Sequence, residues 1–228
     1  MPGRPQKVDH LRLNLAADIE SARSLATAAL QLQAVNQPGR LHPKHVRRIV
    51  ELAFLGVVAE WDGFVEQAFV RYLCGAATNT GCAPTLAVGR ARNIQHAYAI
   101  VSQSATYNPT QQYLRFSDAR WTLQKAGFFF AGVTPFDALR AHLARLQDAV
   151  AIRNRVAHNS SKSRADFKGV ALAYVNPGGG TLSQGYRAGD LLLTPATRHF
   201  GGSPITPGRT YFDAFLDMYD QLALRVVP

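Results

Sequence analysis

The residues best suited to chemistry in this sequence are Arg153, Asn154 and His158, which fall within one short stretch. A histidine ring exchanges protons near neutral pH, because its unperturbed pKa is about 6.5. Arginine stays cationic and can hold two phosphate oxygens in a fixed fork. Asn154 would lie one helical turn from His158 and could orient the ring or a phosphate. This set suits cleavage of RNA through its own 2′-hydroxyl, a reaction that needs no metal or other cofactor when one group moves the proton and another stabilises the phosphate charge.

These residues lie at the end of a predicted helix, Thr134 to Ser160. Thr134 suits the N-cap position, Pro135 suits the first turn, and Asp137 suits the positive end of the helix dipole. The apolar residues of the segment share one arc at 100° per residue: Leu139, Leu143, Leu146, Val150 and Ala157.

The helical wheel places Arg153 inside this apolar arc, with Asn154 on its shoulder and His158 just beyond. Arg155 and Asp148 point the opposite way. A guanidinium on a buried stripe must be paired or must face a cleft, because burying an unpaired charge is costly. The polar cluster therefore marks either a site or an interface.

A second long helix is predicted from Pro43 to about Gly75, apolar on most sides and therefore central. Glu60, Asp62 and Glu66 interrupt it. They form either a solvated strip, which is the commoner case, or a charged pair in which Asp62 or Glu60 holds Arg153.

The remaining pattern predicts an all-α helical bundle in a single domain, residues 1–228. Residues 1–7 read as a loose basic arm, and 160–205 as a loop or small β insertion with a hairpin near 185–194. Phe128 to Phe130 is expected to pack in the core or at a dimer contact rather than to stack on bases. The further predicted helices are Asp9 to Val35, Asn93 to Ser102, Ser117 to Lys125 and Arg209 to Val226.

The composition favours a folded, basic, non-membrane protein. The hydrophobic content is 47%, and the net charge is +10, mostly from arginine. Such an excess favours contact with a polyanion such as RNA, although a basic chain can also arise without any functional meaning. No signal peptide or apolar run of membrane length is visible, so we expect a cytoplasmic protein. Cys74 and Cys82 match no common zinc spacing, and we expect no metal.

The stretch Arg153-Asn154-x-x-x-His158, at the end of the penultimate long helix, resembles the R-x4-6-H signature of the HEPN superfamily. Ala59-Glu60-Trp61-Asp62-Gly63-Phe64 resembles a tryptophan-acid-aromatic patch of stand-alone prokaryotic members. The resemblance covers about Pro43 to His158 and the last helix. It implies a helical bundle that dimerises and, in many members, cleaves RNA without metal in toxin and antiviral systems. Other members lack activity and serve as binding modules.

The spacing alone is weak evidence, because about two matches are expected by chance in so basic a chain. Of the matching pairs, the Arg153 pair lies on a long, capped, amphipathic helix. The other pairs are Arg4 with His10, Arg40 with His45, and Arg90 with His96, where Arg92-Asn93 adds a second match.

The sequence therefore predicts a homodimeric ribonuclease, a toxin or defence effector that could have an antitoxin or other partner protein. Arg153 would stabilise the phosphate, His158 would act as general base or acid, Asn154 would orient them, and Asp62, or Glu60, would fix Arg153. Because five helical residues turn through about 140°, two chains would have to combine their arginine and histidine. The alternatives are an inactive HEPN module that binds RNA, a nucleotide or a protein, and a DNA-binding protein that uses residues 40–48.

Overall fold

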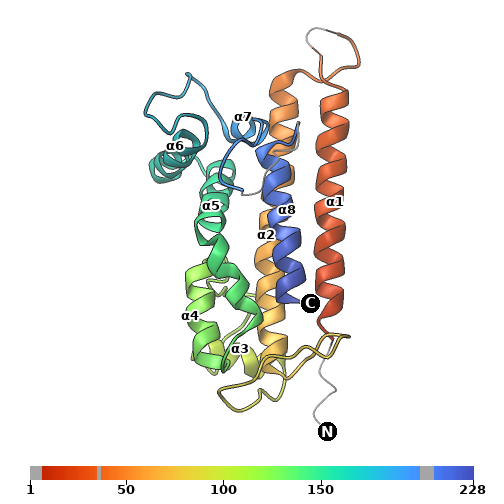
Figure 1. The fold of residues 1–228 in the computed structure, drawn as a ribbon, viewed down its shortest axis with the longest axis vertical. Coiled ribbons are helices and arrows are strands. Elements are labelled where there is room, and N and C mark those ends of the chain that lie inside the picture. The colour runs from red at the N-terminus through yellow and green to blue at the C-terminus, as the bar shows by residue number, and fades with distance from the viewer. Residues whose placement is uncertain (1–6, 35–36, 201–207) are drawn as a thin grey trace. The chain divides into compact units, whose positions relative to one another are not determined.

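The computed structural model describes residues 7–34, 37–200 and 208–228 and is built of helices (Figure 1). Among these residues β-structure is limited to isolated bridges, so the predicted all-α class is confirmed. None of the helices in this part of the chain is long and apolar enough to cross a membrane. Of the predicted arm only Lys7 lies within the described residues, where it donates from Nζ to Asn79 Oδ1 at 2.7 Å.

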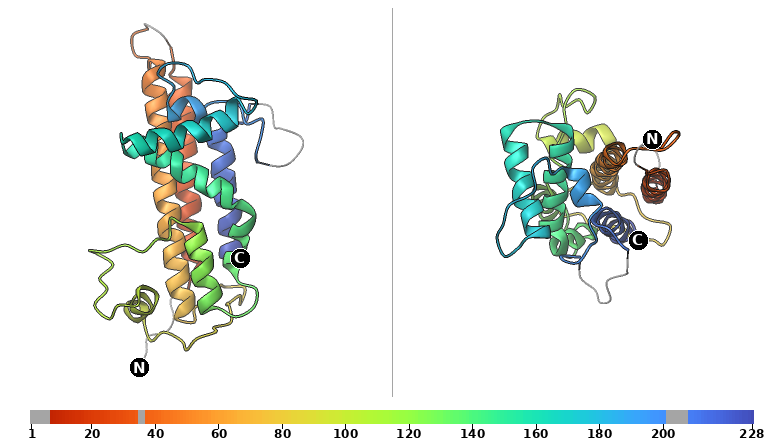
Figure 2. Two further views of the ribbon diagram at one scale, coloured as in Figure 1. Left: turned by 90° about the vertical axis from the view of Figure 1, so that its left-hand side faces the viewer. Right: turned by 90° about the horizontal axis from the view of Figure 1, so that it is seen from above.

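Some helices follow one another directly, such as η1 and α5, whereas long loops join α2 to α3 and α3 to α4 (Figure 2). In chain order they are α1 (Asp9–Gln31), α2 (Pro43–Leu73), α3 (Ile94–Ser102), α4 (Ala119–Phe129), the 3₁₀ helix η1 (Pro135–His142), α5 (Leu143–Ala157), α6 (Ser161–Val175), α7 (Ala188–Leu192) and α8 (Tyr211–Val226). The predicted first, second, third and last helices are confirmed to within a few residues.

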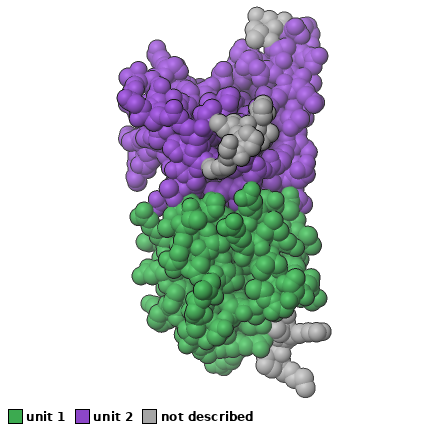
Figure 3. All heavy atoms as spheres, in the orientation of Figure 1, with its two compact units in different colours: residues 1–16, 60–143, 220–228 green, residues 17–59, 144–219 purple. Residues whose placement is uncertain are grey.

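The chain divides into two compact units (Figure 3). Unit 1 comprises Met1–Ala16, Glu60–Leu143 and Asp220–Pro228, and unit 2 comprises Ala17–Ala59 and Ala144–Tyr219. Helices α1, α2 and α8 contribute residues to both units. A single domain over 1–228 stays a prediction.

Unit 1 has an aromatic core centred on Phe69 of α2. Its ring lies 5.0 Å from that of Phe136 and 5.1 Å from that of Phe130, centroid to centroid. Phe129 is buried as well, whereas Phe128 is 63% exposed. Two of the three consecutive phenylalanines therefore pack in the core, as expected, and the third faces solvent. Burying rings of this size contributes much of the apolar stabilisation of so small a unit.

Unit 2 is held by buried aromatic residues and by charge pairs. The Phe215 ring of α8 contacts Phe54 of α2 at 5.4 Å, and Tyr211 contacts Tyr174 of α6 at 4.8 Å, centroid to centroid. The core face predicted for the last helix is confirmed, because all its members are buried: Phe212, Phe215, Leu216, Tyr219 and Leu222.

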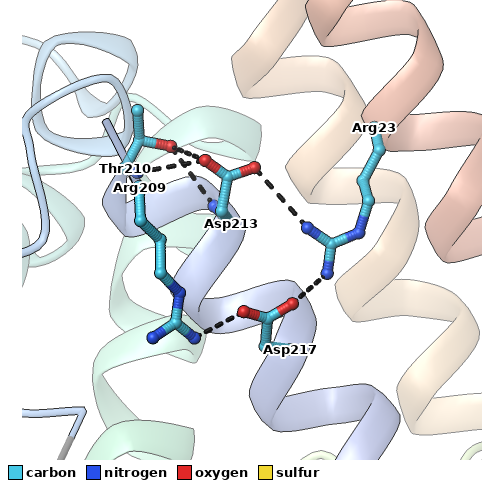
Figure 4. Close-up of polar contacts among 5 residues, drawn as sticks. All are labelled: Arg23, Arg209, Thr210, Asp213 and Asp217. Atoms are coloured by element: carbon cyan, nitrogen blue, oxygen red, sulfur yellow. Dashed lines mark hydrogen bonds and ion pairs between the residues drawn. The ribbon is translucent and has the colours of Figure 1, made fainter. Parts of the chain in front are cut away.

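Two carboxylates on α8 each meet an arginine from elsewhere in unit 2 (Figure 4). Asp217 pairs with both Arg23 of α1 and Arg209, and Asp213 lies 3.5 Å from an Arg23 nitrogen. Asp213 also accepts hydrogen bonds from the backbone and hydroxyl of Thr210 at 3.0 and 2.7 Å. The network ties α1 and the residues before α8 to the first half of α8.

The predicted loop or β insertion at 160–205 is wrong for much of the part that the structure describes, and its residues 201–205 lie outside the described residues. Residues 161–175 form helix α6, and residues 188–192, in the predicted hairpin, form helix α7. Ser160 is the α6 N-cap and accepts a hydrogen bond from the Ser163 backbone at 3.1 Å. Phe167, Ala171 and Tyr174 form its buried face, so the tertiary contacts of this face outweigh the low helix propensity of Gly169.

The predicted continuous helix from Thr134 to Ser160 is also corrected. Thr134 is the N-cap, as expected, but Pro135–His142 is a 3₁₀ helix and α5 runs only from Leu143 to Ala157. A 3₁₀ helix turns about 120° per residue instead of 100°. A helical wheel drawn at 100° per residue through residues 135–142 therefore assigns the residues of α5 to the wrong face.

The buried face of α5 reflects this change of rotation. It consists of Leu146, Ala149 and Ile152, whereas the predicted stripe member Val150 is half-buried and Ala157 is exposed. Helix α4 differs too, because it begins after Asp118 rather than Ser117 and continues through Gly127 to Phe129.

Candidate functional site

Arg153 and Asn154 lie in the last turns of α5 and contact each other. The Arg153 Nη1 donates to the Asn154 Oδ1 at 2.9 Å, and both residues are half-buried. Arg153 is therefore next to the buried face at Ile152 rather than within it. The amide oxygen holds one edge of the guanidinium and so helps to fix its orientation.

His158 lies one residue beyond the end of α5 and is exposed. Its backbone N–H still donates to the Asn154 carbonyl at 2.8 Å, so the helical path continues to this residue. The imidazole can therefore meet a ligand from solvent. Because the path stays helical, the wheel angle of about 140° between Arg153 and His158 also applies here, and the expectation of a site shared by two chains stays a prediction.

A serine fixes the corner between α5 and α6. The Ser163 Oγ donates to the His158 carbonyl at 2.9 Å, and Ser163 is 5% exposed. Ser160 caps α6 two residues after His158. Neither serine is among the predicted site residues, although the spacing of Ser160 and Ser163 just ahead of Phe167 is typical of a helix start.

Further along α5 a polar network binds α6. The Tyr174 hydroxyl lies 2.8 Å from the Arg145 Nη1 and donates to Asp148 Oδ2 at 2.9 Å, while Arg145 and Asp148 form an ion pair at 3.0 Å. Burial raises the pKa of Asp148, and the attraction of Arg145 offsets this only in part. Asp148 therefore faces Tyr174 of α6 and not open solvent, contrary to expectation. The network orients the α5–α6 pair that carries His158.

The acidic residues proposed to support Arg153 lie in unit 1. Glu60 is exposed, as expected of a solvated strip, and Asp62 is half-buried. Their neighbours Trp61 and Phe64 are each 4% exposed, with ring centroids 5.5 Å apart. The aromatic part of this patch is therefore core packing, and the pairing of Asp62 or Glu60 with Arg153 stays a prediction.

The strongest competing Arg-His pair has local structural contacts. Arg90 donates from Nε to the Cys74 carbonyl at 2.6 Å. His96 accepts the Arg92 backbone N–H on its Nδ1 at 3.1 Å, and Asn93 caps α3 by accepting from the His96 backbone at 2.8 Å. These contacts stabilise the loop that precedes α3. They favour a structural role for these residues over a catalytic one.

A pocket of about 320 Å³ lies elsewhere in unit 2, at the start of α2 and beside α7. Its charged lining residues, Arg47 and Asp190, pair with each other at 2.7 Å, so the pocket offers little net charge to a ligand. It includes neither Arg153 nor His158. Within the described ranges, no three His, Cys, Asp or Glu side chains gather as a metal site.

Comparisons of the chain with protein-family models, with curated proteins and with solved structures found no match.

Proposed function

We propose that this protein is a metal-independent endoribonuclease of the HEPN type, acting in the cytoplasm as a homodimer within a toxin or defence system. The observation that supports the proposal is the end of α5, where Arg153 is held by Asn154 and followed by an exposed His158. The resemblance to the R-x4-6-H signature and the net charge of +10 support it as well.

In the proposed reaction the RNA 2′-oxygen attacks the adjacent phosphorus and the bond to the 5′-oxygen breaks. The His158 imidazole accepts the 2′-hydroxyl proton, and the departing 5′-oxygen takes up a proton from the imidazolium so formed or from water. Arg153 stabilises the negative charge that gathers on the phosphate oxygens. The products are a 2′,3′-cyclic phosphate and a free 5′-hydroxyl.

The test is cleavage of a labelled single-stranded RNA by purified protein in EDTA. We expect a fragment whose mass is one water below that of the linear phosphate. His158→Ala should reduce the rate by about 10²–10⁴-fold, the usual contribution of a general acid or base. His45→Ala is the matched control, because His45 is exposed on α2 and outside the site. Undiminished cleavage by His158→Ala refutes the proposed roles.

The shared site has its own test. Inactive Arg153→Ala and His158→Ala proteins are mixed and allowed to exchange chains. If each site combines the arginine of one chain with the histidine of its partner, half of the dimers regain one of their two sites. About a quarter of the wild-type activity should return, whereas a site built within one chain gives none.

A non-enzymatic module remains the second candidate, since inactive members of the superfamily share the fold. RNA binding without cleavage, unchanged in the Arg153→Ala/His158→Ala double variant, would establish it in place of the nuclease.

A further inference from the structure

The corner between α5 and α6 concentrates the positive charge of the chain. Residues 153–168 contain five Lys or Arg and one acidic residue, a net charge of +4 out of +10 for the whole sequence. These sixteen residues are a small part of the 228. A local excess of this kind attracts a polyanion far more strongly than the same charge spread over the surface.

The two flanks of α6 differ in how their charges are used. Lys162 forms an ion pair with Asp166 at 2.9 Å, so this flank is nearly neutral. Arg164 and Lys168 lie about 200° further round the wheel, on the other side of the buried face. Both are exposed, and neither makes an ion pair within the part of the chain that the structure describes. One turn apart, they form a pair of neighbouring cations.

The flank of α6 that carries Arg164 and Lys168 has a fixed position relative to the His158 backbone. The bond from Ser163 Oγ to the His158 carbonyl joins the two helices, and Ser163 belongs to the same first turn as Arg164. The positive end of the α6 dipole also lies beside His158. Arg164 therefore lies in the turn of α6 that is joined to His158, and Lys168 lies one turn further along.

We propose that Arg164 and Lys168 form a binding surface for the sugar-phosphate backbone of RNA, which guides a strand to His158 without reading its sequence. The proposal rests on the proposed ribonuclease site but is carried by a separate observation, the two exposed cations that make no ion pair with any residue the structure describes. Lysine and arginine contacts to phosphates position a nucleic acid and carry no base preference.

The experiment measures binding of a single-stranded RNA oligonucleotide in the His158→Ala background, where cleavage does not interfere. Each phosphate contact contributes about 0.7 to the slope of log K against log salt for single strands. Arg164→Gln/Lys168→Gln should therefore reduce the slope by about 1.4, equally for RNAs of different sequence. Glutamine keeps good helix propensity, and circular dichroism verifies that α6 is intact.

Two control variants accompany the test, one that matches the loss of two positive charges and one that alters α6 without changing the net charge. Arg40→Gln/Lys44→Gln removes two exposed cations near the start of α2, the surface expected of a DNA-binding protein, and should leave the slope unchanged. Lys162→Gln/Asp166→Asn removes an ion pair and should also leave it unchanged.

The outcomes separate the two proposals. A slope unchanged by the α6 variant, or reduced only by the α2 variant, overturns this inference. Binding to anionic lipid vesicles but not to RNA also overturns it. Protein that binds RNA through α6 but cuts none in EDTA retains the surface and refutes the nuclease.

Discussion

Gly189→Ala is the substitution whose cost the structure defines best. A Cβ at this position of α7 would lie 2.7 Å from the Arg47 carbonyl oxygen and 2.8 Å from the Arg47 Cβ. Neither atom belongs to the far end of a flexible side chain, so a rotamer change cannot relieve the clash. Helix α7 would have to move away from α2.

That movement also affects a buried charge. The Gly189 backbone N–H donates to the Glu51 Oε1 at 3.0 Å, and Glu51 is 5% exposed. Overpacking costs about 1–3 kcal/mol, and a hydrogen bond to a charged group contributes about 1.5–3 kcal/mol, part of which is lost. Alanine regains at most about 1 kcal/mol of helix propensity. We expect the free energy of unfolding to fall by about 2–4 kcal/mol.

The assay is urea denaturation followed by circular dichroism, with Gly169→Ala as the matched control. Gly169 lies inside α6, and an added Cβ there meets nothing within 4 Å. The same chemical change should therefore stabilise the protein by about 0.5–1 kcal/mol. If Gly189→Ala proves as stable as wild type, or follows the control, the close approach of α7 to α2 is not a real constraint.

Further predictions concern unit 1. Tyr72→Phe removes the buried hydrogen bond of 2.8 Å to the Val226 carbonyl and should cost about 1–3 kcal/mol in urea denaturation, because the carbonyl loses its partner. Asp118→Ala removes the α4 N-cap and should lower the free energy of unfolding by about 0.5–2 kcal/mol, whereas Asp118→Asn should retain most of the capping stabilisation. Burial opposes ionisation of Asp137, but hydrogen bonds led by that from the Thr134 backbone outweigh it and hold its pKa below the ordinary value. The folded state is therefore favoured by ionised Asp137 above about pH 4 and loses this contribution as the pH falls further. Acid unfolding of Asp137→Asn should show a weaker pH dependence there, and an unchanged profile would contradict the assignment.

The elements predicted well from sequence are those with a strong pattern of their own. Helix α8 carries a full apolar face from Phe212 to Leu222, and α2 begins at Pro43 as its sequence indicates. Such periodicity needs no knowledge of the neighbours. The same holds for Asn93, whose capping chemistry is local.

The elements predicted poorly depend on contacts that a sequence does not display. Helix α6 combines Gly169 with a polar start, and its helical state relies on burying Tyr174 against the residues of α5 and α8. The rotation of α5 depends on η1, and few local features of residues 135–142 distinguish a 3₁₀ from an α-helix. The candidate site residues could be chosen from the chemistry of their side chains. The extent to which Arg153 is buried could not be predicted, because it depends on tertiary contacts.

The bond from Ser163 to His158 gives position 158 a double character. The carbonyl oxygen of His158 joins α5 to α6, and any amino acid except proline would supply an equivalent backbone at this position. The imidazole ring is not needed for this contact. Under the proposed function, replacing His158 removes the group that transfers the proton and leaves the fold intact. A catalytically active chain and an inactive variant would then have the same fold and differ in the side chain at position 158.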